Sequence, residues 1–180
     1  MEVHKIGKFN VNGDKLIACD PCYLKHEEIT DYMVQLENVL PGTYDVEITV
    51  YDSDETSGCG RRNAELVICH EKYELDGWPM DLIEDATVGV DSGQVLFANE
   101  SSHKEYLAAG EDVRDAFYER CCKVTCNSDL NAGIVSNMPV SESGLGDGCY
   151  NVFVARNDEK QIVAASVEFI SESEIDDEEE

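Results

Sequence analysis

Glycines surround one acidic residue in the stretch SGLGDGCYNVF, residues 143–153. Three of them, Gly144, Gly146 and Gly148, lie around Asp147. Exposed amides in such a loop can cradle an anion, and the carboxylate can bind a metal ion or act as a general base. The loop is not a Walker phosphate loop, because no Gly-Lys-Ser/Thr follows it and it leads into a strand. A glycine-rich turn ahead of a strand is the structural alternative.

A second polar turn contains Asp91, Ser92 and Gln94. We predict that it lies near Asp147, so that these four residues form a candidate ligand site. A serine hydrolase would also need a base that activates Ser92. The nearest histidine is His103, which we expect to be a surface or hydrogen-bonded residue. The turn is therefore a candidate ligand site, and the two acids and the serine alone are not enough to predict a hydrolase.

Cysteine spacing raises the question of a metal or redox site. Residues 19–22, Cys-Asp-Pro-Cys, have the spacing found in zinc sites and redox pairs. The remaining thiolates of a zinc site could come from Cys121, Cys122 and Cys126. This second group lacks a clean Cys-x-x-Cys, and the first pair ends a strand instead of opening a helix. Zinc and redox sites stay open as alternatives, but we expect structural thiols, with no metal and no cofactor.

Charge is the most unusual property of the composition. Thirteen Lys and Arg residues stand against 39 Asp and Glu residues, which gives a formal net charge of −26. The last ten residues, SESEIDDEEE, hold seven acids and no base, so the rest of the chain still carries −19. Such a charge repels nucleic acid and anionic membranes and attracts basic partners. The other interpretation is that the acidity only keeps the protein soluble.

Five acids are candidates for contact with a basic partner. Asp45 and Glu47 alternate onto one face of a predicted strand. Asp52, Asp54 and Glu55 continue the row into the loop that follows. We predict that these residues form the partner-binding face.

An internal repeat organises the chain. The segment VNGDKLIACD, residues 11–20, aligns without a gap on VDSGQVLFAN, residues 90–99, with Asp20 matched to Asn99. Gly-x-Tyr strands follow in both halves, at residues 44–51 and 150–156, and further strands begin near Ala64 and Gln161. We expect one helix in each half, such as residues 106–122.

These patterns predict an α+β fold with a mainly antiparallel, sandwich-like or barrel-like core. It would be built from two duplicated halves, with two peripheral helices and a disordered acidic C-terminal tail. The predicted parts are residues 1–75, the first half; 76–86, a connection anchored by Trp78; 87–170, the second half; and 171–180, the tail. The two halves would form one compact domain, because each covers the sheet that the other leaves open.

Three segments carry a resemblance to a known family: VDSGQVLFAN, the long second-half segment that begins AGIVSNMPV and contains GLGDGCYNVFV, and DKLIACDPCY. They resemble an uncharacterised domain family of bacteria and their phages, whose members often show an Asp-Ser-Gly-Gln turn and a Gly-Asp-Gly-x-Tyr strand pair. The resemblance implies a fold but no activity. The acidity departs from that pattern and resembles phage anti-CRISPR and anti-restriction inhibitors.

We therefore expect a non-catalytic acidic protein that inhibits a nucleic-acid-processing enzyme by occupying its basic groove, as DNA mimics do. The alternative is a small enzyme or ligand-binding domain that uses the glycine loops at Asp91 and Asp147. No secretion signal is recognisable, and no apolar run approaches about 18 residues, so we expect a cytoplasmic protein. The sequence does not predict the identity of the partner or the oligomeric state.

Overall fold

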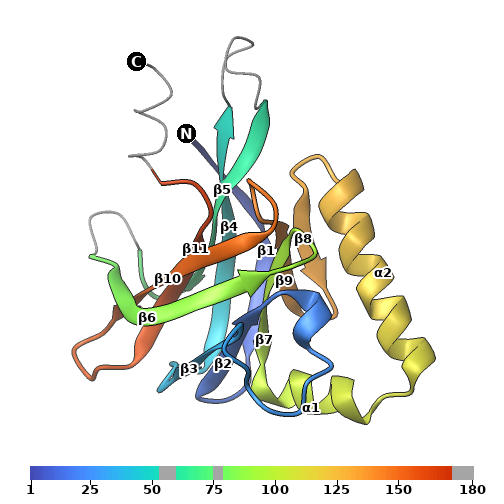
Figure 1. The fold of residues 1–180 in the computed structure, drawn as a ribbon. Helices are drawn as coiled ribbons and strands as arrows, with labels where there is room; N and C mark the ends of the chain where they lie inside the picture. The colour runs from blue at the N-terminus through green and yellow to red at the C-terminus, as the bar shows by residue number, and fades with distance from the viewer. Residues whose placement is uncertain (53–59, 75–78, 172–180) are drawn as a thin grey trace.

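A computed structural model describes residues 1–52, 60–74 and 79–171, which form two antiparallel sheets and a helical layer (Figure 1). The first sheet has six strands, in the order β1 (Glu2–Val11), β4 (Gly42–Asp52), β5 (Arg61–His70), β11 (Ile162–Glu168), β10 (Gly148–Arg156) and β6 (Asp81–Val90). The second sheet has five, in the order β3 (Val34–Glu37), β2 (Lys15–Cys19), β7 (Gln94–Asn99), β9 (Met138–Glu142) and β8 (Ala132–Val135). The predicted antiparallel sandwich is confirmed, and neither sheet closes into a barrel.

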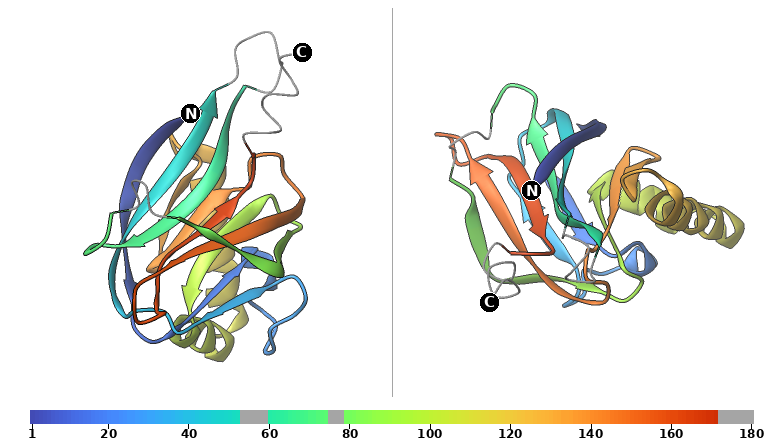
Figure 2. Two further views of the ribbon diagram at one scale, coloured as in Figure 1. Left: turned by 90° about the vertical axis from the view of Figure 1, so that its left-hand side faces the viewer. Right: turned by 90° about the horizontal axis from the view of Figure 1, so that it is seen from above.

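The five-stranded sheet is buried on both faces. Every residue of β7 is buried, because its side chains alternate between two apolar layers. Val95 and Phe97 pack into the core between the sheets, while Leu96 and Ala98 pack toward the helices. Viewed from above, the helices lie on one side of this sheet and the six-stranded sheet lies on the other (Figure 2). The sheet is therefore the central layer of the molecule.

Both helices belong to the second half of the chain. They are α1 (Glu100–Ala108) and α2 (Glu111–Asn127), and the chain leaves helical geometry between them at Ala109 and Gly110. Within the described residues, neither helix is long and apolar enough to cross a membrane. The two predicted helices thus exist, but their assignment of one to each half was wrong.

The first half has a short 3-10 turn, η1 (Pro21–Tyr23), where a helix was expected. Asp20 caps this turn with its side chain, and Pro21 is the first residue within it. Farther on, the alternation of buried Val34 and Leu36 produces strand β3. The acidic stretch between these elements has no helical apolar stripe that could pack against the sheet.

The order of strands in the six-stranded sheet agrees with the predicted repeat. Reading inward from either edge, β1, β4 and β5 correspond to β6, β10 and β11, and the two sets meet where β5 pairs with β11. The boundaries of the halves remain a prediction. Strand β6 begins at Asp81, so part of the segment expected as the connection, 76–86, is a strand. Trp78 lies outside the described residues.

The Gly-x-Tyr motif has the same structural use in both halves. The Tyr44 hydroxyl donates to the Leu40 carbonyl over 2.7 Å, and the Tyr150 hydroxyl donates to the Gly146 carbonyl over 2.8 Å. Each tyrosine thus ties its strand to the backbone four residues upstream, as in a tyrosine corner. Gly42 precedes Tyr44 in a positive-φ conformation, and a Cβ there would collide with the buried His70 ring. The motif therefore anchors each strand to the segment that precedes it.

We predict that Tyr44→Phe lowers the free energy of unfolding by about 1–2 kcal/mol, because buried carbonyl groups lose their donor. The Tyr44 hydroxyl also lies 3.2 Å from the Ile162 carbonyl, so the loss affects β11 as well. Urea denaturation followed by circular dichroism measures the change. Tyr32→Phe is the matched control, since Tyr32 is 54% exposed, and its stability should stay within about 0.5 kcal/mol of the wild type. Equal stability of both variants would contradict a stabilising role of the Tyr44 hydroxyl.

Candidate functional site

The Asp20 carboxylate is the centre of a buried polar cluster. Asp20 follows β2 and is 0% exposed. Its Oδ1 accepts hydrogen bonds from the Cys22 backbone amide at 2.8 Å and the Ser92 hydroxyl at 2.6 Å. Its Oδ2 accepts from the backbone amides of Asp91 at 2.9 Å and Ser92 at 2.7 Å. The carboxylate thus joins η1 to the turn between β6 and β7.

The cluster continues from Ser92 to helix α2. The Gln94 side-chain amide donates to the Ser92 hydroxyl at 3.2 Å and to the Cys122 sulfur at 3.4 Å. The Gln94 carbonyl oxygen accepts from the Thr125 hydroxyl at 3.1 Å. We call these five residues, Asp20, Ser92, Gln94, Cys122 and Thr125, the Asp20 network.

The hydrogen-bonding capacity of the Asp20 network is largely used within the protein. A carboxylate offers about four acceptor positions, and four donors reach Asp20. Ser92 donates its hydroxyl hydrogen to Asp20, while Gln94 uses its amide group and its carbonyl oxygen internally. A general base or a metal ligand needs a free lone pair. The arrangement therefore suits a structural connector better than a reaction centre.

Asn99, which the repeat aligns with Asp20, makes the reciprocal connection. Its side-chain oxygen accepts from the Asn12 amide at 3.0 Å, and its amide group donates to the Asn10 carbonyl at 2.9 Å. Because β2 and β7 are antiparallel neighbours, the end of each strand lies beside the turn that precedes the other. Asp20 therefore reaches the turn before β7, and Asn99 reaches the turn before β2.

Asp91 and Asp147 present their side chains to solvent at neighbouring turns. Val90, just before Asp91, pairs with Gly148, just after Asp147. The Ser143 amide also donates to the Gly93 carbonyl over 3.0 Å. The two polar turns therefore lie side by side in the backbone. Ser92 and Gln94 instead contribute to the Asp20 network.

His103 serves the loop after η1 rather than Ser92. It is 4% exposed, and its Nε2 lies 3.0 Å from the Leu24 carbonyl and 2.9 Å from the His26 carbonyl. Because both partners are acceptors, Nε2 carries the proton. A base that activates Ser92 is thus not supplied by this histidine.

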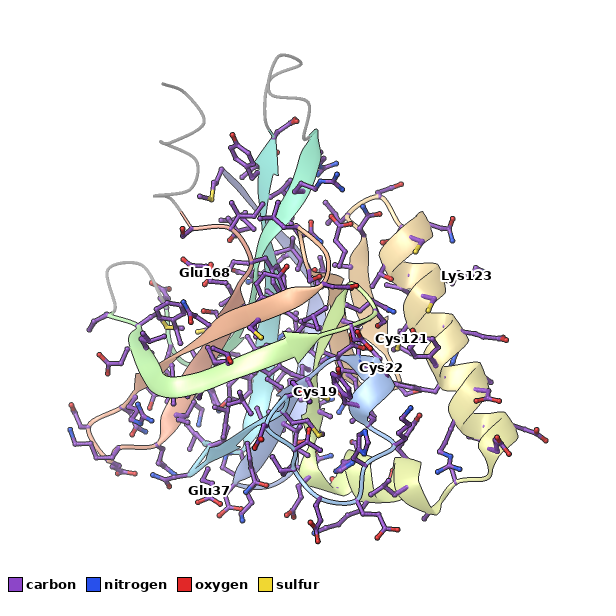
Figure 3. All side chains as sticks on the ribbon, in the orientation of Figure 1. Cys19, Cys22, Glu37, Cys121, Lys123 and Glu168 are labelled. Atoms are coloured by element: carbon purple, nitrogen blue, oxygen red, sulfur yellow. The ribbon has the colours of Figure 1, made fainter. Side chains whose placement is uncertain are left out.

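Burial favours the protonated form of three thiols near the network. Cys19 and Cys121 pack together in the core between the central sheet and the helices, and Cys22 lies on η1 (Figure 3). Burial raises the pKa of Cys22 and of Cys121 to about 12, and the charge of Asp20 adds to both effects. Burial also raises the pKa of Cys19 well above its usual value. Metal ions bind thiolates, which these environments disfavour.

The described residues contain no group of three or more His, Cys, Asp or Glu side chains placed to hold a metal ion. Cys19 is nevertheless near both Cys22 and Cys121, as a zinc hypothesis would require. The α2 helix brings them together by apolar packing. The absence of bound zinc stays a prediction.

Lysines of the neighbouring strand offset part of the negative charge on the predicted partner-binding face. Asp45 and Glu47 are half-buried on β4, on the face opposite the core. On β1, the Lys5 ammonium lies 3.0 Å from Oδ2 of Asp45, and the Lys8 ammonium lies 3.9 Å from Oδ1. Asp52, at the end of β4, is exposed. The remaining candidates, Asp54 and Glu55, lie outside the described residues.

Sequence reasoning missed the importance of Asp20, Cys122 and Thr125. The alignment of Asp20 with Asn99 was the one available signal, because it placed a polar residue at the end of two buried strands. The contribution of α2 had no signal, since nothing in the spacing of Cys122 and Thr125 points to a turn about thirty residues away.

We predict that Asp20→Ala lowers the free energy of unfolding by about 3 kcal/mol, because three partly buried backbone amides and the Ser92 hydroxyl lose their acceptor. Asp91→Ala is the matched control, since it lies beside the network but has an exposed side chain. It should change stability by less than about 0.5 kcal/mol. Urea denaturation of both variants provides the comparison. If Asp20→Ala were as stable as Asp91→Ala, the Asp20 network would not be a structural connector.

We predict that a short iodoacetamide pulse at pH 8 labels the exposed Cys126 and Cys149 before Cys22, whose thiol is protonated at that pH. Peptide mass spectrometry gives the order of labelling.

Elemental analysis of protein purified without added metal should show less than stoichiometric zinc. About one zinc per chain that is lost in Cys19→Ser, or faster labelling of Cys22, would contradict the assignment of structural thiols.

Comparison with known proteins identifies a family whose function is not known. A family model described as "Protein of unknown function (DUF4241)" matches residues 9–167. No curated protein matches the chain, and no solved structure matches it. The matched range contains the Asp20 network, both helices and nearly all of the strands, but not the acidic tail. The resemblance to an uncharacterised family is thereby confirmed, and the chain belongs to the DUF4241 family.

Proposed function

We propose that the protein is a non-catalytic acidic binding protein whose partner is basic. The observation that carries this proposal is the charge imbalance: if every Lys and Arg were paired with an acid, 26 carboxylates would remain. Ion pairs already engage several of the lysines, with Asp45, Glu71, Glu37 and Glu100 as their partners. The excess negative charge is carried on a scaffold of paired strands, which suits long-range attraction of a cationic surface.

The partner class that fits best is a nucleic-acid-processing enzyme, whose basic groove normally holds phosphates. Carboxylates on a rigid β scaffold can occupy the Arg and Lys side chains of such a groove. Inhibition would then follow from competition with DNA or RNA. The acidity supports this proposal, and the closed Asp20 network supports it indirectly by disfavouring chemistry at the most polar buried cluster.

The contact face proposed for this role is the end of β4 and the loop beyond it. Glu47 and Asp52 are its contributors within the described residues, followed by Asp54 and Glu55. Asp45 contributes less, because Lys5 and Lys8 offset its charge. An exposed pair is worth roughly 0–1 kcal/mol, so binding would rest on many weak contacts rather than on one residue.

A ligand site at Asp91 and Asp147 is the second candidate. It is favoured by one observation: strand pairing brings the two turns together, and both carboxylates are exposed. Ser92 and Gln94 would contribute little to it, since their polar groups are engaged in the Asp20 network. Such a site would lose its function when one of its two carboxylates, such as Asp147, is removed.

The two candidates predict different responses to mutation. A partner is first captured from cells that contain the protein, at low and at high salt, and its binding to duplex DNA or to RNA is then measured in competition with the protein. We expect inhibition to fall stepwise through the series Glu47→Lys, Asp52→Lys, Asp54→Lys and Glu55→Lys, and to weaken as salt rises. Glu119→Lys, on the exposed side of α2, is the charge-matched control and should have a smaller effect.

Asp147→Ala separates the candidates. In the binding proposal this variant inhibits almost as well as the wild type. All-or-none loss of function in Asp147→Ala, with no dependence on salt, would contradict the acidic-binder proposal and favour the ligand site.

A further inference from the structure

Two tyrosines stack on the surface of the loop between β2 and β3. The rings of Tyr23, on η1, and Tyr32 lie 5.4 Å apart between centroids and are inclined by only 17°. Tyr32 is 54% exposed, and Tyr23 is partly buried against the core between sheet and helices. In Figure 1 this loop is the blue segment that follows β2 and passes beside α1. Exposed aromatic rings of this kind are enriched at the energetic centres of protein interfaces.

The loop that carries the pair is held at several points. The Asp20 network fixes its beginning, and His103 of α1 bonds the Leu24 and His26 carbonyls in its middle. At its end, the Gly89 amide of β6 donates to the Tyr32 carbonyl over 3.1 Å. These contacts orient the rings in the free protein, so that binding a partner would cost little ordering entropy.

Gly89 allows Tyr32 to lie directly against β6. A Cβ at Gly89 would approach the Tyr32 ring to 2.7 Å and the Tyr32 Cβ to 2.9 Å, closer than carbon atoms can pack. Gly89 itself is buried under this ring. Tyr32 therefore lies against the sheet backbone, and 54% of the residue stays exposed.

Negative charge surrounds the pair. Glu27, Glu28 and Asp31 are exposed on the same loop, where Lys25 is the only Lys or Arg between Cys22 and Tyr32. The Asp91 carboxylate is close enough that, after burial, it is the strongest influence raising the pKa of the Tyr23 phenol. A flat π surface within a negative field favours a flat cation, because the ring quadrupole and the carboxylates attract it together.

We propose that the exposed face of the Tyr23–Tyr32 pair anchors an arginine side chain of a basic protein segment, with Asp31 and Asp91 as countercharges. Arginine fits better than lysine, since its planar guanidinium stacks on aromatic rings and is less strongly hydrated. This inference rests on the proposed function, because it assigns to a basic partner a docking point separate from the β4 face.

The test uses the full-length protein and two acetylated peptides, hexa-arginine and hexa-lysine, with affinities measured by isothermal titration calorimetry at low salt. We expect the wild type to bind hexa-arginine more tightly than hexa-lysine. Tyr32→Ala should weaken hexa-arginine binding by about two- to fivefold, with a smaller effect on hexa-lysine. Tyr32→Leu keeps an apolar side chain on Gly89 but lacks the π face, and it should behave like Tyr32→Ala. Val113→Ala, at a 61% exposed position on α2, is the control and should bind like the wild type.

The outcomes distinguish this inference from the proposed function. If Tyr32→Ala and Tyr32→Leu bind hexa-arginine as the wild type does, while the β4 reversal series weakens it, the anchor is wrong and the acidic binder stands. If the wild type binds neither peptide, both proposals fail. If sedimentation shows a wild-type dimer that Tyr32→Ala dissociates, the pair belongs to an interface between two copies, and the arginine anchor is overturned.

Discussion

Two buried polar side chains, Asp20 and Asn99, connect the two halves of the molecule. Each ends a strand of the central sheet, and each bonds the turn that precedes the neighbouring strand. Burial of a carboxylate is costly unless its oxygens have donors, so the turn must keep the amides of Asp91 and Ser92 pointed at Asp20. The arrangement of η1, of β6 and β7, and of the loop after η1 depends on this requirement.

The same requirement limits the chemistry of the cluster. Once Asp20, Ser92 and Gln94 have used their polar groups on one another, little remains for a substrate. Ser92 and Gln94, two residues of the predicted ligand site, thus take part in a structural junction. In the proposed function its contribution would be indirect, because it positions the loop that carries Tyr23 and Tyr32 and the turn that carries Asp91.

The central sheet imposes a second constraint. Because it is buried on both faces, its outer face needs a cover, and the two helices of the second half provide one. Their apolar sides pack on the sheet, which leaves their charged sides and the acidic loops to form the surface. The excess of acids and the exposed Tyr32 therefore lie on the exterior, which is where the proposed binding would occur.

The sequence by itself determined the antiparallel class, most strands and the acidity, because alternation and turn residues are local signals. It also aligned Asp20 with Asn99. It could not assign both helices to one half, since the weak periodicity of residues 21–40 does not show that the loop lacks a sheet face to cover. Only the tertiary structure decided that Asp20 reaches the other half, that Lys5 and Lys8 offset Asp45, and that Tyr23 meets Tyr32. Such contacts join residues far apart in the chain, and their geometry is set by strand pairing and packing rather than by spacing.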